Sequence, residues 1–378
     1  MARLIAILLI LFLPAAAAGP AKNVILFIGD AAGIPTINGA SIYKYNAPRK
    51  LFIQNLPNIG LMDTSTASEW VTDSAAGMTA IVTGVKTRNG VISQDATAVR
   101  GKKDGRELKT ILEYAEQHGL STGVVTNSLV ADATPAACYA HSNDRGRHGA
   151  IFAQVLKPAY GDGIDVIIGP SEKEIVQVTH DAGVDIKTEL AAHGFGPYSS
   201  MEAVPPGARR AVVLLPDGNF DVNRAAQLAI DILSRNPKGF FLMVESDCHM
   251  NRFISGLGHL LMLDDTIRQT VQRTNAADTL IVFAADHSYD FRIHGGKRGQ
   301  PLFADLRFPG SENDLDSVHL HNVRRDDSHT GEEVMVSATG PGADRVHGYI
   351  ANTDLFHIML AAFGWDSQPA SGREEARK

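Results

Sequence analysis

The sequence predicts an α/β protein with a doubly wound, mostly parallel sheet and helices on both faces. Short, nearly continuous apolar runs alternate along the chain with longer segments whose apolar residues recur at helical spacing. Strands that are apolar on both sides are typical of parallel sheets covered by two helical layers. The 378 residues are 44% hydrophobic and 20% charged, which is enough apolar material for a sizeable core.

The strands are predicted from their apolar runs, which are too short for helices. The first run, at 23–28, reads NVILFI and is typical of a buried strand. Further runs of the same kind predict strands at 121–126, 165–169, 210–215, 239–244, 279–285 and 333–338.

The helices are predicted from periodicity and end signals. In 107–118 the apolar residues Leu108, Ile111, Leu112 and Ala115 share one helix face, and Gly119 suits the helix end. Similar patterns predict helices at 225–235, 253–274 and 353–363. The polar region at about 287–328 lacks either pattern, so we expect a long functional loop or small excursion there.

The first 18 residues resemble a secretory signal peptide. Arg3 supplies a positive start, residues 4–13 are apolar, and small residues at 15–18 suit a cleavage site. We expect one domain at 19–378 after cleavage, in a protein exported to the periplasm or the extracellular space. An uncleaved anchor is the alternative. Cys138 and Cys248 could pair in an oxidising compartment, and their spacing leaves this open.

The net charge of −7 and the composition exclude several functions for this chain. Nucleic-acid binding needs a basic field that this acidic chain does not present, so we expect no nucleic-acid surface. No segment after residue 18 is long and apolar enough for a membrane span. Two cysteines cannot build a Cys-rich zinc module, but 14 histidines offer many metal ligands.

Acidic and histidine side chains follow four of the predicted strands. In open α/β sheets, ligands bind beyond the carboxyl ends of the strands, so these side chains are expected to meet. A cluster of bare carboxylates repels itself and is most simply stabilised by divalent cations, zinc where imidazole joins and magnesium where hydroxyl and water do. The residues concerned are Asp30, Asp132, Thr134, Glu245, Asp247, His249, Asp286 and His287.

Ser74 is followed by small residues and lies where a helix is expected to start. One interpretation is a plain N-cap, worth about 1 kcal/mol. The other is a nucleophile that faces an anion at the positive end of the helix dipole, activated by a nearby metal. The local pattern leaves both open.

The ordered motifs resemble those of the bacterial alkaline phosphatase family over most of the chain after residue 18. The run DATPAA followed by a histidine and then an arginine is especially diagnostic. The motifs are 23–30 (NVILFIGD), 73–75 (DSA) with 83–87 (TGVKT), 132–137 (DATPAA) with His141 and Arg145, Glu245, 285–287 (ADH) and 329–331 (HTG).

The resemblance implies a role for each matched residue. Ser74 would attack phosphorus and become phosphoserine, Arg145 would clamp phosphoryl oxygens, and Asp73 would orient Arg145. Two zinc ions and one magnesium ion are implied. Asp30, Asp286 and His287 would hold the second zinc with Ser74; Asp247 and His329 would belong to the first; Asp30, Thr134 and Glu245 would hold magnesium, with Asp132 in its water shell.

The resemblance therefore implies an exported, metal-dependent phosphomonoesterase with an alkaline phosphatase-like fold, acting on small phosphate monoesters and forming a homodimer. A phosphodiesterase or sulfatase of the same superfamily is one alternative. The sulfatase motif, however, does not resemble residues 73–75. A secreted metal- or phosphate-binding protein that has lost catalysis is another alternative.

One stretch departs from the family pattern. The family usually has an aspartate with a histidine four residues later, which share one helix face and reach one zinc. Here Asn251 stands four residues after Asp247, and His249 stands two residues after it. Either an irregular turn lets His249 bind, or the first zinc has fewer protein ligands, with His294 a further candidate. Cys248 could join a metal as a thiolate or be a free buried cysteine.

Overall fold

A ten-stranded sheet forms the centre of the computed structural model, which describes residues 19–303, 317–319 and 321–365. The predicted signal peptide at 1–18 lies outside the described residues. The strand order is β15-β2-β14-β8-β1-β7-β3-β4-β6-β5. The strands are β1 (Asn23–Asp30), β2 (Asn58–Asp63), β3 (Ser121–Val125), β4 (Val166–Pro170), β5 (Gly196–Tyr198), β6 (Ala211–Leu215), β7 (Phe240–Asp247), β8 (Thr279–Ala284), β14 (Val334–Thr339) and β15 (Gly348–Ala351).

The sheet is mostly parallel, as predicted. β1 pairs in parallel with β7 on one side and β8 on the other, and β3, β4, β6 and β5 continue the parallel order. Only β14 runs against its neighbours β8 and β2 in this sheet. The central strands are fully buried along most of their length because both of their faces are covered.

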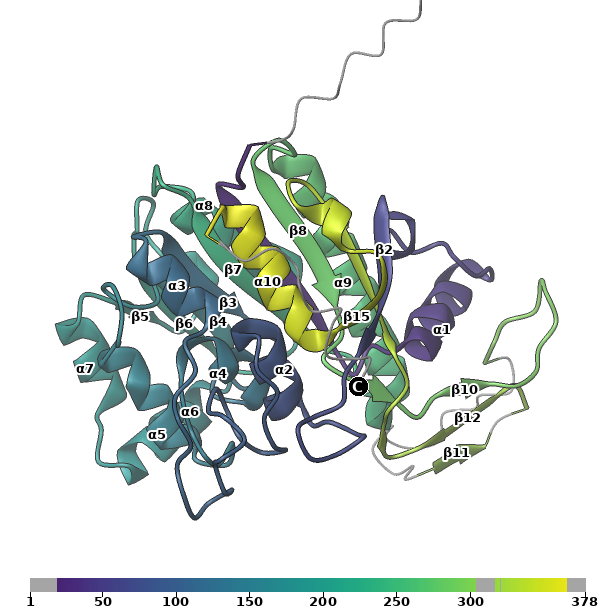
Figure 1. The fold of residues 1–378 in the computed structure, drawn as a ribbon, viewed down its shortest axis with the longest axis horizontal. Coiled ribbons are helices and arrows are strands. Elements are labelled where there is room, and N and C mark those ends of the chain that lie inside the picture. The colour runs from purple at the N-terminus through teal and green to yellow at the C-terminus, as the bar shows by residue number, and fades with distance from the viewer. Residues whose placement is uncertain (1–18, 304–316, 320, 366–378) are drawn as a thin grey trace, which may run out of the picture.

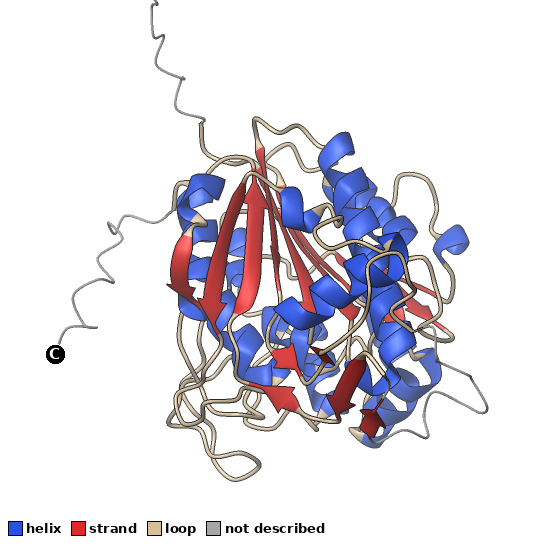
Figure 2. Ribbon diagram, turned by 90° about the vertical axis from the view of Figure 1, so that its right-hand side faces the viewer, coloured by secondary structure: helices blue, strands red, loops and turns tan. Residues whose placement is uncertain are grey.

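Helices cover both faces of the sheet (Figure 2). One layer contains α2 (Ser74–Thr83), α3 (Ile111–Gln117), α4 (Ala133–Tyr139) and α10 (Asn352–Phe363), which contact one another and the central strands (Figure 1). The other contains α1 (Ile34–Tyr45), α8 (Val222–Leu233) and α9 (Phe253–Arg273). The remaining helices are α5 (His148–Phe152), α6 (Glu172–Asp181) and α7 (Ile186–Ala192).

The predicted strands and helices are found, with one clear correction of a boundary. The predicted helix at 107–118 begins only at Ile111, because a capping box between Thr110 and Glu113 fixes the start of α3. Leu108, which fitted the helical period, instead donates its backbone N–H to the Ser93 carbonyl oxygen. Gly119 follows the helix in the left-handed region at a φ of +71°, as its position suggested.

The predicted polar excursion at about 287–328 contains short strands where the structure describes it. β10 (Arg292–Ile293), β12 (Val323–Asp326) and β11 (Ser317–His319) form a small sheet beside the central one (Figure 1). β9 (Ser288–Tyr289) pairs with β13 (His329–Thr330), so both ends of the excursion are joined at the sheet edge where the acidic residues gather. Among the described residues, no helix has the length and apolar character of a membrane span.

Candidate active site

The strand ends that carry the predicted metal ligands lie side by side. β8, β1, β7 and β3 are consecutive in the sheet, and Asp30 at the end of β1 stands in register with Asp247 at the end of β7. Because these strands run in parallel, their carboxyl ends face one edge of the sheet. The sheet thus brings Asp30, Glu245, Asp247 and Asp286 to one place, as the sequence predicted.

Asp30 is the centre of this group. Its Oδ1 lies 3.2 Å from His287 Nε2, which in turn lies 3.6 Å from Asp286 Oδ2. Asp286 and His287 are fully buried, and Asp30 is only 5% exposed. One ligand atom from each of these three residues lies within 4.8 Å of the others, a spacing that a single metal ion can bridge.

Ser74 reaches the same group from helix α2. Its Oγ lies 3.3 Å from His287 Nε2 and 3.5 Å from Asp30 Oδ2. The N-cap interpretation is wrong for Ser74, because the N-cap is Asp73, whose carboxylate accepts from the backbone N–H of Ala76 at 3.0 Å. Ser74 is therefore the first residue of the helix, and its hydroxyl points toward the acidic group.

Helix α2 can approach the strand ends because of Gly77. A Cβ at this position would stand 2.8 Å from the Asp286 carbonyl oxygen, closer than side chains tolerate. The absence of a side chain at Gly77 therefore lets the helix that begins with Ser74 lie against the segment that carries Asp286.

Arg145 is held by two carboxylates, one of which belongs to Asp73, the residue before Ser74. Its Nη1 donates to Asp73 Oδ2 at 3.1 Å and its Nη2 donates to Asp132 Oδ1 at 2.9 Å. Asp73 also accepts from the backbone N–H of Gly90 at 2.9 Å, so the carboxylate is itself fixed. The side chain of Arg145 keeps 23% exposure, which leaves its guanidinium accessible to an anion.

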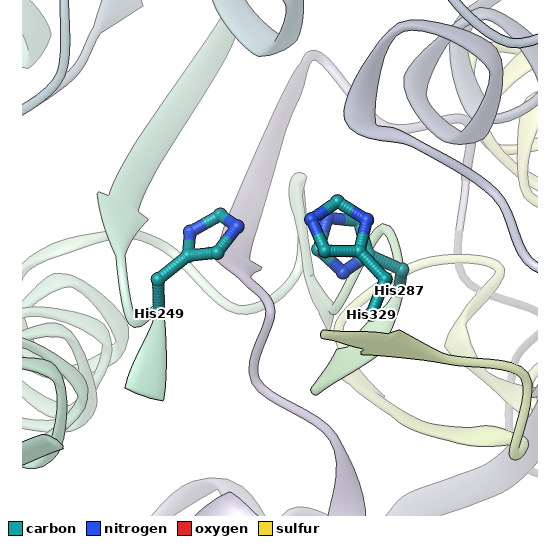
Figure 3. A group of neighbouring side chains, drawn as sticks. All are labelled: His249, His287 and His329. Carbon is teal, nitrogen blue, oxygen red and sulfur yellow. The ribbon is translucent and has the colours of Figure 1, made fainter. Parts of the chain in front are cut away.

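Three histidines, His249, His287 and His329, lie close together (Figure 3). The rings of His287 and His329 stack with centroids 3.8 Å apart, and the ring of His249 stands opposite them. His249 Nδ1 lies 2.8 Å from Asp247 Oδ1 and 3.7 Å from Asp30 Oδ1. His329 Nδ1 donates to the Thr72 carbonyl oxygen at 3.1 Å.

His249 joins this group because the chain after β7 is not helical. His249 has an extended backbone, with φ of −57° and ψ of 135°, and residues two apart on an extended chain face the same way. Of the two alternatives, the irregular turn is the one found. Asn251 and His294 are exposed and are not among the clustered side chains.

Thr134, Glu245 and Asp132 lie on the other side of Asp30. Thr134 Oγ1 lies 3.5 Å from Asp30 Oδ2, and Glu245 is 1% exposed and accepts a hydrogen bond from Thr126 Oγ1. Asp132 caps helix α4, which carries Thr134. A hydroxyl, a carboxylate and a shared aspartate form a set of oxygen donors of the kind that magnesium takes.

The buried oxygen atoms of this cluster fit divalent cations. Asp30 Oδ1 and Asp286 Oδ2 are buried and make no hydrogen bond of good geometry with any described residue, although His287 Nε2 lies 3.2 Å from the first and 3.6 Å from the second. A buried carboxylate oxygen without a donor is costly unless a cation contacts it. Imidazole and carboxylate together suit zinc, and the residues present therefore fit the metals that the sequence analysis expected.

The pKa values in the cluster show how strongly its charges interact. Burial and the neighbouring Asp30 raise the pKa of Asp286 to about 6 and that of Glu245 well above its usual range. Burial would lower the pKa of His249, but Asp30 and Asp247 raise it to about 10. Burial and the neighbouring His287 lower the pKa of His329 to about 4.

The two cysteines are free and buried in the structure. Cys248 Sγ contacts the Ser246 carbonyl oxygen at 3.2 Å, and burial raises the pKa of its thiol well above the usual range. A neutral, buried thiol is the simpler of the two interpretations for Cys248, and Cys138 lies inside helix α4.

Some residues that shape the site were not assigned a role from the sequence, although Asn127 directly follows the strand predicted at 121–126. Asn127 Oδ1 accepts from the backbone N–H of Asp247 at 2.6 Å, and His259 Nδ1 donates to its carbonyl oxygen at 2.6 Å. Asn89 Oδ1 accepts from the backbone N–H of Asp73 at 3.1 Å. These residues come from a loop and from the face of a helix, so only the folded chain reveals them.

Comparison with known proteins identifies relatives of this chain. The family model described as alkaline phosphatase matches residues 21–181 and 222–313. The chain is 29% identical to the alkaline phosphatase of Escherichia coli strain K12, covering 91% of this chain and 86% of that protein. It is 28% identical to the human tissue-nonspecific alkaline phosphatase, covering 90% of this chain and 83% of that protein.

A solved structure shares the arrangement of the chain. It is a variant of the TAB5 alkaline phosphatase with magnesium bound, and it is 25% identical with a TM-score of 0.74. The alignment covers 92% of this chain and 99% of that one, so the likeness extends over nearly the whole fold.

Proposed function

We propose that this chain, which belongs to the alkaline phosphatase family and is a metal-dependent phosphatase, is an exported phosphomonoesterase that works through a phosphoserine at Ser74. The observation that carries the proposal is the position of the Ser74 hydroxyl. It stands at the start of a helix, within 3.5 Å of Asp30 Oδ2 and 3.3 Å of His287 Nε2, beside an accessible arginine.

Two zinc ions and one magnesium ion are the cations that we assign to the cluster. Asp30, Asp286 and His287 would hold the second zinc together with Ser74, and this set has the compact spacing that one ion needs. Asp30, Thr134 and Glu245 would hold magnesium, with Asp132 in its water shell. When bound, these cations supply positive charge for the attacking and leaving oxygens of an in-line displacement.

The first zinc would use Asp247, His249 and His329. His249 takes the place of the family histidine that normally stands four residues after the aspartate. It does so from an extended segment rather than from a helix, and it lies near both His329 and Asp247. We therefore expect a complete first site, which favours an active enzyme over a binding protein that has lost catalysis.

The residues of the chain then divide the reaction between them. Arg145 binds two phosphoryl oxygens, and Asp73 and Asp132 hold its guanidinium in place. Ser74 Oγ attacks phosphorus, the bond from phosphorus to the ester oxygen breaks, and the alcohol leaves. Water then attacks phosphorus, breaks its bond to Ser74 Oγ and releases phosphate. The helix dipole of α2 favours the anion throughout. A phosphate monoester carries one more negative charge than a diester. It therefore suits this combination of arginine and cations better than a diester does.

Export and assembly complete the proposal. The apolar segment at 1–18 would direct export to the periplasm or the extracellular space, and the remaining chain would act as one domain on small phosphate monoesters. A homodimer is the assembly that the family resemblance suggests.

The test is to trap the intermediate. Wild-type protein loaded with zinc and magnesium, mixed with a monoester and quenched in acid, should carry phosphate on the peptide that contains Ser74. Ser74→Ala should lose this label and at least a thousandfold in kcat, and Ser68→Ala, an exposed serine in the preceding loop, should behave as wild type. Preferential turnover of a diester or a sulfate ester, or a label elsewhere, would contradict the proposal.

A further inference from the structure

The loop between β2 and α2 presents one large aromatic side chain to solvent. Trp70 is 87% exposed, the highest value among the large hydrophobic side chains that the structure describes. Ala67, Ser68 and Glu69, which precede it, are small or polar and are also exposed. The tryptophan is therefore an exposed ring that follows three small or polar residues along the chain.

The backbone that carries Trp70 is tightly fixed. Asn89 Nδ2 donates to Glu69 Oε2 at 3.0 Å and to the Val71 carbonyl oxygen at 3.1 Å, so one side chain holds both neighbours of the tryptophan. On the other side, Thr66 Oγ1 accepts from the backbone N–H of Glu69 at 2.8 Å. The hydrogen bonds therefore fix the backbone from which the indole projects into solvent.

This position borders the site. Thr72, two residues after Trp70, accepts a hydrogen bond from His329, and Ser74 begins the helix two residues further on. On the opposite side, a Cβ at Gly331 would stand 3.1 Å from the Trp70 carbonyl oxygen. The loop thus packs against the segment that carries His329, which is the side that we assign to the first zinc and the leaving oxygen.

We propose that Trp70 is a specificity residue that stacks on a planar leaving group, such as the base of a nucleoside monophosphate. The inference rests on the proposed function, because it assigns the substrate class of the same site. An indole has only two rotatable side-chain bonds, so ordering it against a base costs little entropy. Stacking on a base is possible for every base and needs no further hydrogen bonds. A contact with a second copy of the chain is the competing role for an exposed tryptophan.

A matched pair of substrates tests the proposal. Adenosine 5′-monophosphate and ribose 5-phosphate have the same kind of ester bond and differ in the base. For Trp70→Ala, the ratio of kcat/KM for the nucleotide to kcat/KM for the sugar phosphate should fall about tenfold, which corresponds to about 1.4 kcal/mol. Trp70→Phe should keep most of the ratio. Tyr349→Ala, which removes an exposed aromatic ring from the edge strand β15, should leave it unchanged.

A binding measurement separates this inference from the proposed function. The chain has two tryptophans, and Trp365 stacks on Phe363, so Trp365→Phe leaves Trp70 as the only indole. In this variant combined with Ser74→Ala, the nucleotide should quench the fluorescence and the sugar phosphate should not, whether or not the wild type turns over. An unchanged kinetic ratio, equal quenching by both compounds, or a dimer that Trp70→Ala dissociates without a change in ratio would overturn the assignment.

Discussion

Two groups of buried acidic side chains in this molecule differ in how many of their carboxylate oxygens accept hydrogen bonds. Glu113 and Glu116 on α3 accept hydrogen bonds at all four carboxylate oxygens, from His141, Thr110, Thr122 and Gly163. At the strand ends, Asp30 Oδ1 and Asp286 Oδ2 accept none of good geometry and face the imidazole of His287. Burial of acids therefore does not by itself indicate a ligand site, whereas buried acidic oxygens without donors do.

Removal of metal should have the largest effect on activity and stability. This effect should depend on the acidic residues at the strand ends and not on those of α3. Exhaustive chelation should lower phosphatase activity at least a hundredfold and lower the melting temperature, because cations bound to the folded state stabilise it by about 2.7 kcal/mol at a hundred times Kd. Zinc and magnesium together should restore both quantities. Activity assays and calorimetry on the same samples measure this, and full activity after chelation would contradict it.

Asp286→Asn sharpens the same prediction. The amide keeps the shape of the side chain and one acceptor oxygen but removes a negative charge from a crowded cluster. With zinc present, the variant should be less stable than wild type, because a ligand is lost. In chelator it should be equally stable or more stable. An equal loss of stability under both conditions would show that Asp286 is a structural acid like those on α3.

Glu113→Gln should have the next largest effect, and it should not depend on metal. Glu113 Oε1 lies 2.9 Å from His141 Nε2, and both side chains are less than 10% exposed. Removing one partner of a buried pair lowers the free energy of unfolding by about 3–5 kcal/mol. Because glutamine can keep some of the hydrogen bonds of Glu113, we expect a loss near the lower end of this range. Urea unfolding of Glu113→Gln, His141→Gln and the double variant, in chelator and in zinc, gives the coupling energy.

The sign of the pH dependence follows from His141. Burial would lower its pKa, but the hydrogen bond and charge of Glu113 raise it above the usual value. A histidine with a raised pKa in the folded state contributes stability that is fully present below its unfolded pKa of about 6.5 and is lost as pH rises through the folded pKa. The difference in the free energy of unfolding between wild type and Glu113→Gln should therefore be larger at pH 6 than at pH 9. A difference that does not change with pH would exclude an ionic contribution of the pair.

The same contrast explains how far the sequence predicts the molecule. Apolar runs and the polar residues that end them predict which strands carry Asp30, Asp247 and Asp286, because parallel strands end at one edge. For His249 the sequence left two alternatives open, because helical spacing does not apply to an extended segment and only the folded chain shows which alternative holds. Asn89 could not be found either, since it acts from a loop whose path depends on tertiary packing. The sequence also does not distinguish an acid whose carboxylate oxygens all accept hydrogen bonds, such as Glu116, from an acid whose oxygens do not.

Glu116 provides the smallest expected effect and the finest distinction. Although its oxygens are filled, burial raises its pKa to about 7, against hydrogen bonds from Thr122 and Gly163 that lower it. An acid with a raised pKa in the folded state holds a proton that the unfolded chain releases near pH 4.5, so it lowers stability as pH rises from about 4.5 to about 7. At about 1.4 kcal/mol per pH unit, the total cost is at most about 3 kcal/mol.

Glu116→Gln stays neutral, so its unfolding free energy relative to wild type should rise by about 1–3 kcal/mol between pH 5 and pH 8. Urea unfolding in chelator measures this without interference from metal binding, and Glu107→Gln, an exposed glutamate just before α3, should show no such rise. A flat difference for Glu116→Gln would mean that its hydrogen bonds fully compensate burial, and hydrogen bonding alone would then separate the two acidic groups.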